Sequence, residues 1–306
     1  MKYSPTSSEI DMATRATISA LKHISLECCL VGSVACSAYG MTRTPADIDM
    51  VVLTSSHTQE ELKNRLVSYD SRFYTVASKD PFATYRVLWF RLSGYRRSCK
   101  VDLLLPGVMN IPHVPSDRIY RMKDHPKSAS RSTSSSNTTT RHPSTSSASY
   151  SYLYTSTGSG SLLSNLSTDY PLMPFLPLLL LKLQAWQDHG ESPKAYMREK
   201  QPTDVRDITE LLNLAVTKYS GAVSRKQTLL EKERAWIPET FVRDGEKRVK
   251  KYIQLYPSSR SQWMTVGFHT SDTVLSKGSP GMKKMDDDGR MRRLENLMNS
   301  LAFDDY

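Results

Sequence analysis

The sequence predicts an α+β fold, in which a small mixed β-sheet with flanking helices precedes an α-helical C-terminal part. Short apolar runs alternate with polar, periodic stretches between residues 10 and 115, which is typical of mixed α/β structure. Beyond about residue 170, apolar residues recur at helical spacing instead. With 306 residues, 39% of them hydrophobic, the chain is long enough for one or two domains with a core.

The first half is expected to form a small sheet and a few helices. Segments rich in Val, Tyr, Phe, Trp and Leu are typical of strands, and Pro106-Gly107 ends the last of them. Leu62 and Leu66 lie four residues apart with charges between them, which indicates an amphipathic helix. The expected order is helix 10–23, strand 28–31, helix 34–39, strand 48–53, helix 57–69, and strands 73–77, 85–92 and 99–105.

Three regions follow from the change in composition along the chain. Residues 10–115 are expected to form a mixed-sheet core, and residues 116–169 a Ser/Thr-rich insert. The insert is predicted to be disordered, because large aliphatic residues are nearly absent from 127–168 and little apolar surface is available to bury. A tolerated loop insertion is its simplest explanation, and a phosphorylation tract is the alternative. Residues 170–306 are expected to form a helical domain with a flexible segment near 270–290.

Helical spacing supports the assignment of this last region. Ile208, Leu211, Leu212 and Ala215 lie at i, i+3, i+4 and i+7 and define one buried face. The basic stretch from Ser224 to Lys251 is interpreted by default as a solvated helical face. Helices are expected at 178–188, 204–218, 226–236 and 290–303, the last after a linker at 276–289.

Composition excludes several classes of protein. Lys and Arg number 41 against 31 Asp and Glu, and this net charge of +10 favours anionic partners such as nucleotides or RNA. The four cysteines form no CxxC pair, and no HExxH, GxxxxGK[ST] or GxSxG motif occurs. The apolar stretch 172–181 contains two prolines and is too short to span a membrane. We therefore expect a cytoplasmic or nuclear protein that is not secreted and has no membrane partner.

Two features at the ends of predicted strands point to chemistry. Gly32-Ser33 joins a strand directly to a helix, where backbone N–H groups are available to phosphate oxygens. Asp47 and Asp49 are two residues apart on a strand, so both carboxylates leave the same face while Ile48 packs into the core. Co-directed carboxylates suit Mg²⁺. A solvated, acidic strand entrance is the alternative for this pair.

A third carboxylate lies inside an apolar strand. Asp102 is flanked by Val101 and Leu103, and a carboxylate in such surroundings is costly unless it is paired or coordinates a metal. The alternative is an ordinary salt bridge to Arg96, Arg97 or Lys100.

Taken together, Val31-Gly32-Ser33, Asp47-x-Asp49 and Asp102 resemble the pattern of the nucleotidyltransferase superfamily, which has the polymerase-β-like fold. The resemblance implies that Asp47, Asp49 and Asp102 are catalytic and ligate two Mg²⁺ or Mn²⁺ ions, and that Gly32 and Ser33 bind the nucleotide phosphates. It further implies transfer of a nucleoside monophosphate from a nucleoside triphosphate such as ATP to a hydroxyl of RNA, protein or a small molecule.

The helical half extends the resemblance to abortive-infection type nucleotidyltransferases. Lys182, within the run Leu180 to Trp186, and the pair Asp204 and Asp207 match those proteins, although Thr203 replaces their lysine before the first Asp. The resemblance implies that Lys182 and Asp204 bind nucleotide. The alternatives are a surface lysine whose apolar stem is buried and an aspartate that caps a helix.

Three questions stay open at the level of the sequence. Arg43 contacts phosphate or base, or is simply solvated. Tyr85, Trp89 and Tyr95 alternate with arginines, a pattern that occurs in proteins that bind single-stranded nucleic acid, although aromatic core packing is the commoner explanation. The alternative functions are a non-catalytic nucleotide- or RNA-binding protein of the same fold, and a toxin-like partner of an antitoxin.

Overall fold

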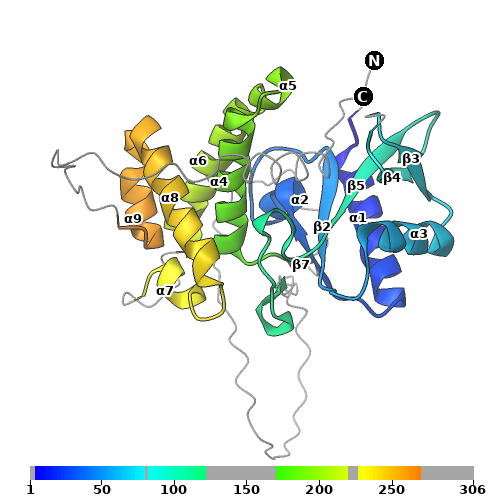
Figure 1. Cartoon of the computed structure of the whole chain (residues 1–306), viewed down its shortest axis with the longest axis horizontal. Helices are drawn as coiled ribbons and strands as arrows, with labels where there is room; N and C mark the ends of the chain where they lie inside the picture. Colours follow the sequence, from blue (N-terminus) through cyan, green and yellow to red (C-terminus); the bar gives the residue numbers. More distant parts are fainter. Residues whose placement is uncertain (1–3, 80–81, 122–169, 220–226, 270–306) are drawn as a thin grey trace, which may run out of the picture.

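The computed structural model describes residues 4–79, 82–121, 170–219 and 227–269 (Figure 1). Its strands form one mixed sheet in the order β3-β4-β5-β2-β1-β7-β6. The predicted α+β class, with a small mixed sheet, flanking helices and a helical C-terminal part, is confirmed. The strands are β1 (Cys28–Val31), β2 (Asp47–Val52), β3 (Phe73–Ala77), β4 (Arg86–Arg91), β5 (Ser98–Leu104), β6 (Tyr120–Arg121) and β7 (Pro171–Leu172).

The sheet is mixed, and helices cover both of its faces. β2 runs antiparallel to β1 and parallel to β5, while β3, β4 and β5 form an antiparallel meander. Helices α1 (Ser7–His23) and α3 (Gln59–Tyr69) lie on one side of the sheet, and α2 (Gly32–Ala38) lies on the other (Figure 1). Side chains on β2 alternate accordingly, with Ile48 and Met50 fully buried and Asp47 and Asp49 partly exposed.

Capping explains where two of the helices begin. Thr6 caps α1 and Thr58 caps α3, in each case with a glutamate at the third helical position that completes a capping box. The expected helices 10–23 and 57–69 are therefore real, but the first begins three residues earlier and the second two residues later.

The helical part is built around α4 (Phe175–Glu191) and α6 (Gln201–Leu214), which pack against each other (Figure 1). α4 begins three residues before the expected 178. Pro177 is tolerated there because it lies in the first turn, where a backbone N–H would have no hydrogen-bond partner within the helix. α6 also begins three residues early and continues through a π-helical segment, η3 (Ala215–Tyr219). Shorter elements are η1 (Val108–Asn110), η2 (Ser116–Arg118), α5 (Ala195–Arg198), α7 (Leu229–Glu233), η4 (Pro257–Ser259) and α9 (Arg260–Val266).

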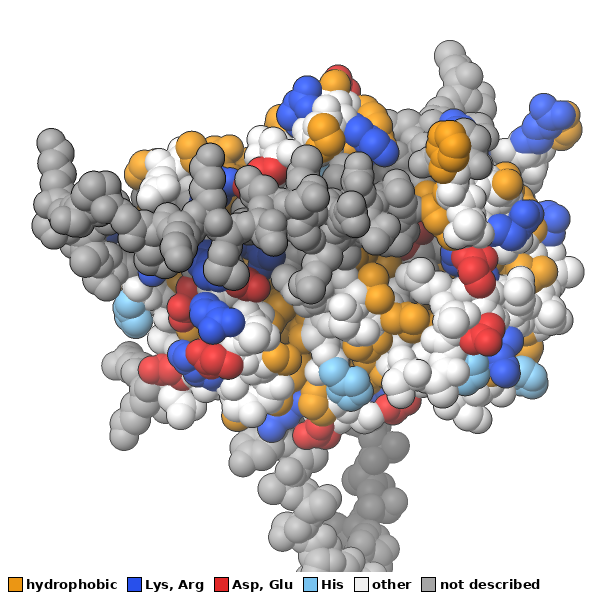
Figure 2. Space-filling model, viewed as in Figure 1, with side chains coloured by type: hydrophobic (Ala, Val, Ile, Leu, Met, Phe, Trp, Pro, Cys, Tyr) orange, Lys and Arg blue, Asp and Glu red, His pale blue; other side chains and the backbone are white. Residues whose placement is uncertain are grey.

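The largest difference from expectation is α8 (Glu239–Leu255), which includes much of the stretch interpreted as a solvated basic face. One side of α8 is buried, and Gly245 approaches α4 so closely that an added methyl group would lie 3.2 Å from Leu180. On the outer side, Lys247 pairs with Asp244, and Lys251 with Glu191 of α4. Figure 2 accordingly shows basic and acidic side chains interspersed over this part of the molecule. α8 is therefore a packed, amphipathic helix.

The two ends of the insert meet in the sheet. Tyr120–Arg121, inside the range assigned to the insert, forms β6 and pairs antiparallel with β7, which begins the helical part. β7 also pairs parallel with β1 through Leu30 and Leu172, so the chain re-enters the sheet after the insert. The bulk of the insert, the expected helix 290–303 and the linker 276–289 lie outside the described residues. No helix among the described ranges is long and apolar enough to cross a membrane.

Candidate active site

The turn after β1 brings the backbone against a carboxylate. Gly32 has φ +59°, a conformation that favours glycine, and a methyl group built on it would lie 1.8 Å from Asp49 Oδ2. A side chain at position 32 would therefore strain the backbone and also displace the Asp49 carboxylate. The glycine predicted from the sequence is required because the Asp49 carboxylate occupies the space beside its Cα.

Three predicted carboxylates come together on one face of the sheet. Asp47 and Asp49 alternate with buried Ile48 along β2, and the register of β2 with β5 places Asp102 directly opposite Asp49. Ser33 Oγ donates to Asp47 Oδ1 at 3.3 Å, which links the Gly-Ser turn to the same group. Residues from three separate segments of the sequence thus meet where β1, β2 and β5 lie side by side.

Burial, reinforced by mutual repulsion, sets the electrostatics of this group. Burial, followed by the charges of Asp47 and Asp102, raises the pKa of Asp49 well above its usual value. The pKa of Asp102 is also raised, mainly by burial, although the nearby Lys100 opposes the shift. Carboxylates that resist ionisation in one another's presence favour any cation that binds between them.

The protein supplies one such cation. Lys100 Nζ lies 3.2 Å from Asp102 Oδ2, and in the strand register Lys100 is opposite Asp47. Burial alone would lower the pKa of Lys100, but the charges of Asp102, Asp47 and Asp49 outweigh it and raise the pKa. The alternative weighed for Asp102, a salt bridge to a nearby basic residue, is therefore present in the structure, and its partner is Lys100.

The donor chemistry of the group suits a divalent metal, whereas the side-chain placement does not yet form a ligand shell. Asp47, Asp49 and Asp102 offer carboxylate oxygens, the ligands that Mg²⁺ and Mn²⁺ prefer. Within the described ranges, however, no three His, Cys, Asp or Glu side chains are gathered closely enough to hold a metal ion as they stand. The residues fit such an ion in kind, and the ion would compete with Lys100 for Asp102.

A second charged cluster, which we call the Asp207 cluster, consists of Arg43, Lys182 and Asp207. Arg43 Nε and Nη2 donate to Asp207 Oδ1 and Oδ2 at 3.0 and 2.7 Å, and Lys182 Nζ donates to Oδ2 at 3.0 Å. The Asp207 side chain is only 2% exposed. Burial alone would raise the pKa of Asp207, but the Arg43 hydrogen bond and the Lys182 charge outweigh it and hold the pKa below its usual value.

The two charged groups act on each other across α2. The charge of Lys182 lowers the pKa of Asp49, in opposition to the larger effect of burial, and the charge of Asp47 contributes to the raised pKa of Arg43. Burial raises the pKa of Cys36 to about 12, and its thiol is within electrostatic range of both Lys182 and Asp49. Lys182 and Arg43 of the Asp207 cluster are therefore electrostatically coupled to the carboxylates of the sheet.

The structure decides three of the alternatives left open by the sequence. Lys182 is not a surface lysine, since its side chain is 13% exposed and its ammonium is paired with Asp207. Asp204 does not cap α6, because Lys200 occupies the N-cap position. Asp204 is instead buried, and its Oδ2 lies 2.5 Å from Nδ1 of His189 on α4. Arg43 is bound to Asp207 and is not simply solvated.

Two partners in these clusters were not among the predicted site residues. His189 lies seven residues after Lys182, a spacing that places both on one face of α4, and this was the only available signal. Lys100 was considered only as a possible salt-bridge partner of Asp102. Its position two residues before Asp102 on a strand places both side chains on the same face.

Comparisons with known proteins give limited matches. No protein-family model and no curated protein matches the chain. A solved structure of an antigenic nucleotidyltransferase-like protein from Paracoccidioides brasiliensis is similar, with 14% identity, a TM-score of 0.49, and coverage of 84% of this chain and 93% of that one. Terminal uridylyl transferase 4 from Trypanosoma brucei, solved with bound GTP, matches 34% of this chain and 32% of its own, at 15% identity and a TM-score of 0.23. The likeness to abortive-infection type nucleotidyltransferases, which comes from the sequence motifs, stays a prediction.

Proposed function

We propose that this chain is a divalent-metal-dependent nucleotidyltransferase that transfers a nucleoside monophosphate from a nucleoside triphosphate to a hydroxyl acceptor. The observation that carries the proposal is the contact between Gly32 and Asp49, with Asp102 in register beside Asp49. The reaction requires a backbone that phosphates can approach, carboxylates that hold a metal ion, and cations that bind the triphosphate. Gly32, the three aspartates, and Lys182 with Arg43 would supply these in turn.

Each residue has a defined task in this proposal. Asp47, Asp49 and Asp102 would hold Mg²⁺ or Mn²⁺, which when bound stabilises negative charge on the attacking and leaving oxygens. Asp102 would receive the proton of the acceptor hydroxyl as its oxygen attacks the α-phosphorus. The bond from that phosphorus to the bridging oxygen breaks, and pyrophosphate leaves.

The phosphates would be held from the opposite side. Gly32 and Ser33 would contact the β- and γ-phosphates. Lys182 and Arg43 would give up their hydrogen bonds to Asp207 and donate to oxygens of the triphosphate instead. Arg43 already presents two donors to a carboxylate, and the same fork matches two oxygens of a phosphate. Asp204 contributes indirectly in this arrangement, because its charge helps to keep Lys182 protonated.

The test is incubation of the purified protein with each labelled nucleoside triphosphate, Mg²⁺ or Mn²⁺, and total cellular RNA. Label is expected in RNA, protein or a small molecule together with released pyrophosphate. Asp49→Asn is expected to reduce turnover at least about 100-fold, since loss of a group that supports a metal site costs 10 to 100-fold even at one remove. Asp117→Asn is the matched control, because Asp117 is 74% exposed and forms an ion pair with the exposed Arg118. Turnover by Asp49→Asn near the wild-type rate would refute the proposal.

The structure also favours a second candidate, a protein that binds nucleotide without turning it over. The observation behind it is the Lys100 contact with Asp102, together with the absence of a gathered ligand shell among the described residues. Metal-dependent triphosphate binding with neither label transfer nor pyrophosphate would select this candidate.

A further inference from the structure

Aromatic and basic side chains on β3, β4 and β5 lie on the same face of the sheet as the three carboxylates. On β4 and β5 every second residue is buried, including Leu88 and Phe90, and on β3 the residue opposite Phe90, Phe73, is buried. The intervening residues share the carboxylate face, because residues opposite each other on neighbouring strands point to the same side. Tyr74 is opposite Trp89, Trp89 is opposite Lys100, and Lys100 is opposite Asp47.

This row, Tyr74-Trp89-Lys100-Asp47, crosses four strands from the sheet edge to the candidate active site. Tyr74 and Trp89 are partly exposed, so these two rings are not core side chains, unlike Leu88 and Phe90. The common explanation of the aromatic residues, core packing, is therefore wrong for Trp89. Arg91, two residues beyond Trp89 on the same face, is exposed, and its guanidinium carbon lies 4.5 Å from the centre of the Tyr74 ring.

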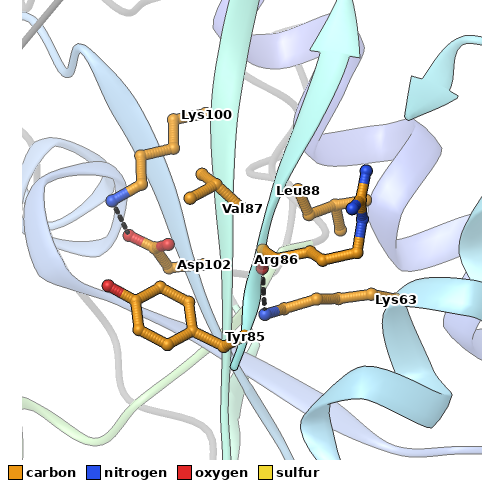
Figure 3. A pocket seen from close by; sticks show the side chains of 7 residues that line it. All are labelled: Lys63, Tyr85, Arg86, Val87, Leu88, Lys100 and Asp102. Carbon is orange, nitrogen blue, oxygen red and sulfur yellow. Dashed lines mark hydrogen bonds and ion pairs between the residues drawn. The ribbon is translucent and has the colours of Figure 1, made fainter. Parts of the chain in front are cut away.

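The row ends beside a pocket that opens next to Asp102 (Figure 3). Lys63, Arg86 and Lys100 contribute positive charge to its lining, and Tyr85 lies beside the Asp102 carboxylate. The cavity itself is small, about 20 Å³, and is open to solvent at its mouth. Because β5 separates β2 from β4, the pocket lies on the side of Asp102 away from Asp49. Nucleotide and pocket would therefore approach Asp102 from opposite sides.

We propose that this row and pocket bind a single-stranded nucleic acid as the acceptor, an inference that rests on the proposed transferase function. The terminal hydroxyl would enter the pocket at Asp102, bases would stack on Trp89 and Tyr74, and phosphates would contact Arg91 on the same face. Aromatic rings interleaved with cations are the means by which proteins bind single strands without selecting sequence.

The size of the row favours a polymer over a small acceptor. Three spacings between strands of about 4.8 Å make the row about 14 Å long. Five stacked nucleotides, separated by four steps of about 3.4 Å, span about the same length. The net charge of +10 on the whole chain favours the same kind of polyanion.

The experiment measures binding of fluorescent 15-nucleotide single-stranded RNA and DNA by anisotropy, without nucleotide, over a range of KCl concentrations. Trp89→Leu is expected to weaken binding on the order of tenfold, and Trp89→Phe, which keeps a ring, to bind nearly as the wild type does. Arg91→Gln is expected to reduce the salt slope by about 0.7. Tyr196→Leu removes an aromatic side chain of similar exposure from α5 and is expected to change nothing.

Outcomes of the binding and transfer assays are separable. If Trp89→Leu and Arg91→Gln bind the RNA and the DNA as the wild type does, the proposed nucleic-acid site is refuted, whatever the transfer assay shows. If the wild type transfers label only to protein or to a small molecule and binds no single strand, the acceptor inference is also refuted. If the variants lose binding as expected but the wild type releases no pyrophosphate, the nucleic-acid site is supported and the transferase function is refuted. Stronger binding of RNA than of DNA would identify RNA as the acceptor. Should Trp89→Leu fail to fold, Tyr74→Leu at the sheet edge makes the same test.

Discussion

Aspartates in the two halves of this molecule experience opposite environments. In the sheet, Asp49 and Asp102 are buried beside like charges, Lys100 is the cation in contact with Asp102, and both pKa values are raised. In the helical half, Asp207 is less exposed than Asp102, at 2% against 19%, yet its pKa is lowered because Arg43 and Lys182 both donate to it. Burial is common to both, so the difference lies in the number of cations supplied by the chain. A fully paired carboxylate stabilises the fold, whereas an under-compensated group favours the binding of a cation.

The comparison predicts its largest stability change at Asp207. Asp207→Asn leaves Lys182 and Arg43 without a counter-charge, and breaking a buried pair from one side costs about 3–5 kcal/mol. We expect about 3 kcal/mol, the lower end, because Arg43 is 37% exposed and water compensates part of its charge. Urea denaturation measures the change in the free energy of unfolding. Asp117→Asn, at an exposed pair, is the control and should stay within about 0.5 kcal/mol. Equal effects of the two variants would contradict the distinction drawn here.

The pH dependence of stability should differ in sign between the two halves. The pKa of Asp207 is lowered on folding, so its stabilisation is present above the unfolded value of about 3.9 and is lost as pH falls through the folded pKa. The pKa of Asp49 is raised on folding, so its penalty appears as pH rises above about 3.9.

Asp49→Asn should therefore increase the free energy of unfolding at pH 7, by the roughly 0.5–2 kcal/mol typical of relieved charge repulsion. This gain should shrink as the pH falls toward 4, while the deficit of Asp207→Asn shrinks over the more acidic range. Denaturation curves of both variants and the wild type between pH 3 and 8 test the assignment. A stability gain that persists unchanged at pH 3.5 would show that repulsion at Asp49 is not its cause.

The smallest expected effect concerns Lys100, the cation in contact with Asp102. Lys100→Met removes the ammonium beside Asp102 and should tighten Mn²⁺ binding about tenfold, in line with the effect of groups that contact metal ligands. Titration followed by electron paramagnetic resonance of free Mn²⁺ measures the affinity directly. Lys247→Met removes the same charge from an exposed position on α8 and serves as the control. If Lys100→Met weakens Mn²⁺ binding, Lys100 supports the metal site and does not compete with it.

Local patterns in the sequence predicted much of the fold. The strands 28–31 and 73–77 have the expected bounds, and the alternation around Ile48 correctly indicated that Asp47 and Asp49 share a face. These features depend on residues within a few positions of each other, where the period of a strand or helix determines direction. α8 shows the limit of such inference. Its basic side chains suggested a solvated face, and its buried positions, Phe241, Val242, Gly245, Val249, Tyr252 and Ile253, have a function only because α4 lies against them.

By itself, the sequence determined the glycine turn, the shared face of Asp47 and Asp49, and the lone carboxylate of Asp102, since each follows from local geometry and residue chemistry. Only the tertiary structure decided that Asp102 lies opposite Asp49, that Lys100 pairs with Asp102, and that Arg43 meets Asp207 across 164 positions of sequence. Strand register and helix docking depend on how whole surfaces bury their apolar area, and no single segment encodes that choice. The same packing pairs Asp207 with Arg43 and Lys182, and it places Asp47, Asp49 and Asp102 close enough to repel one another.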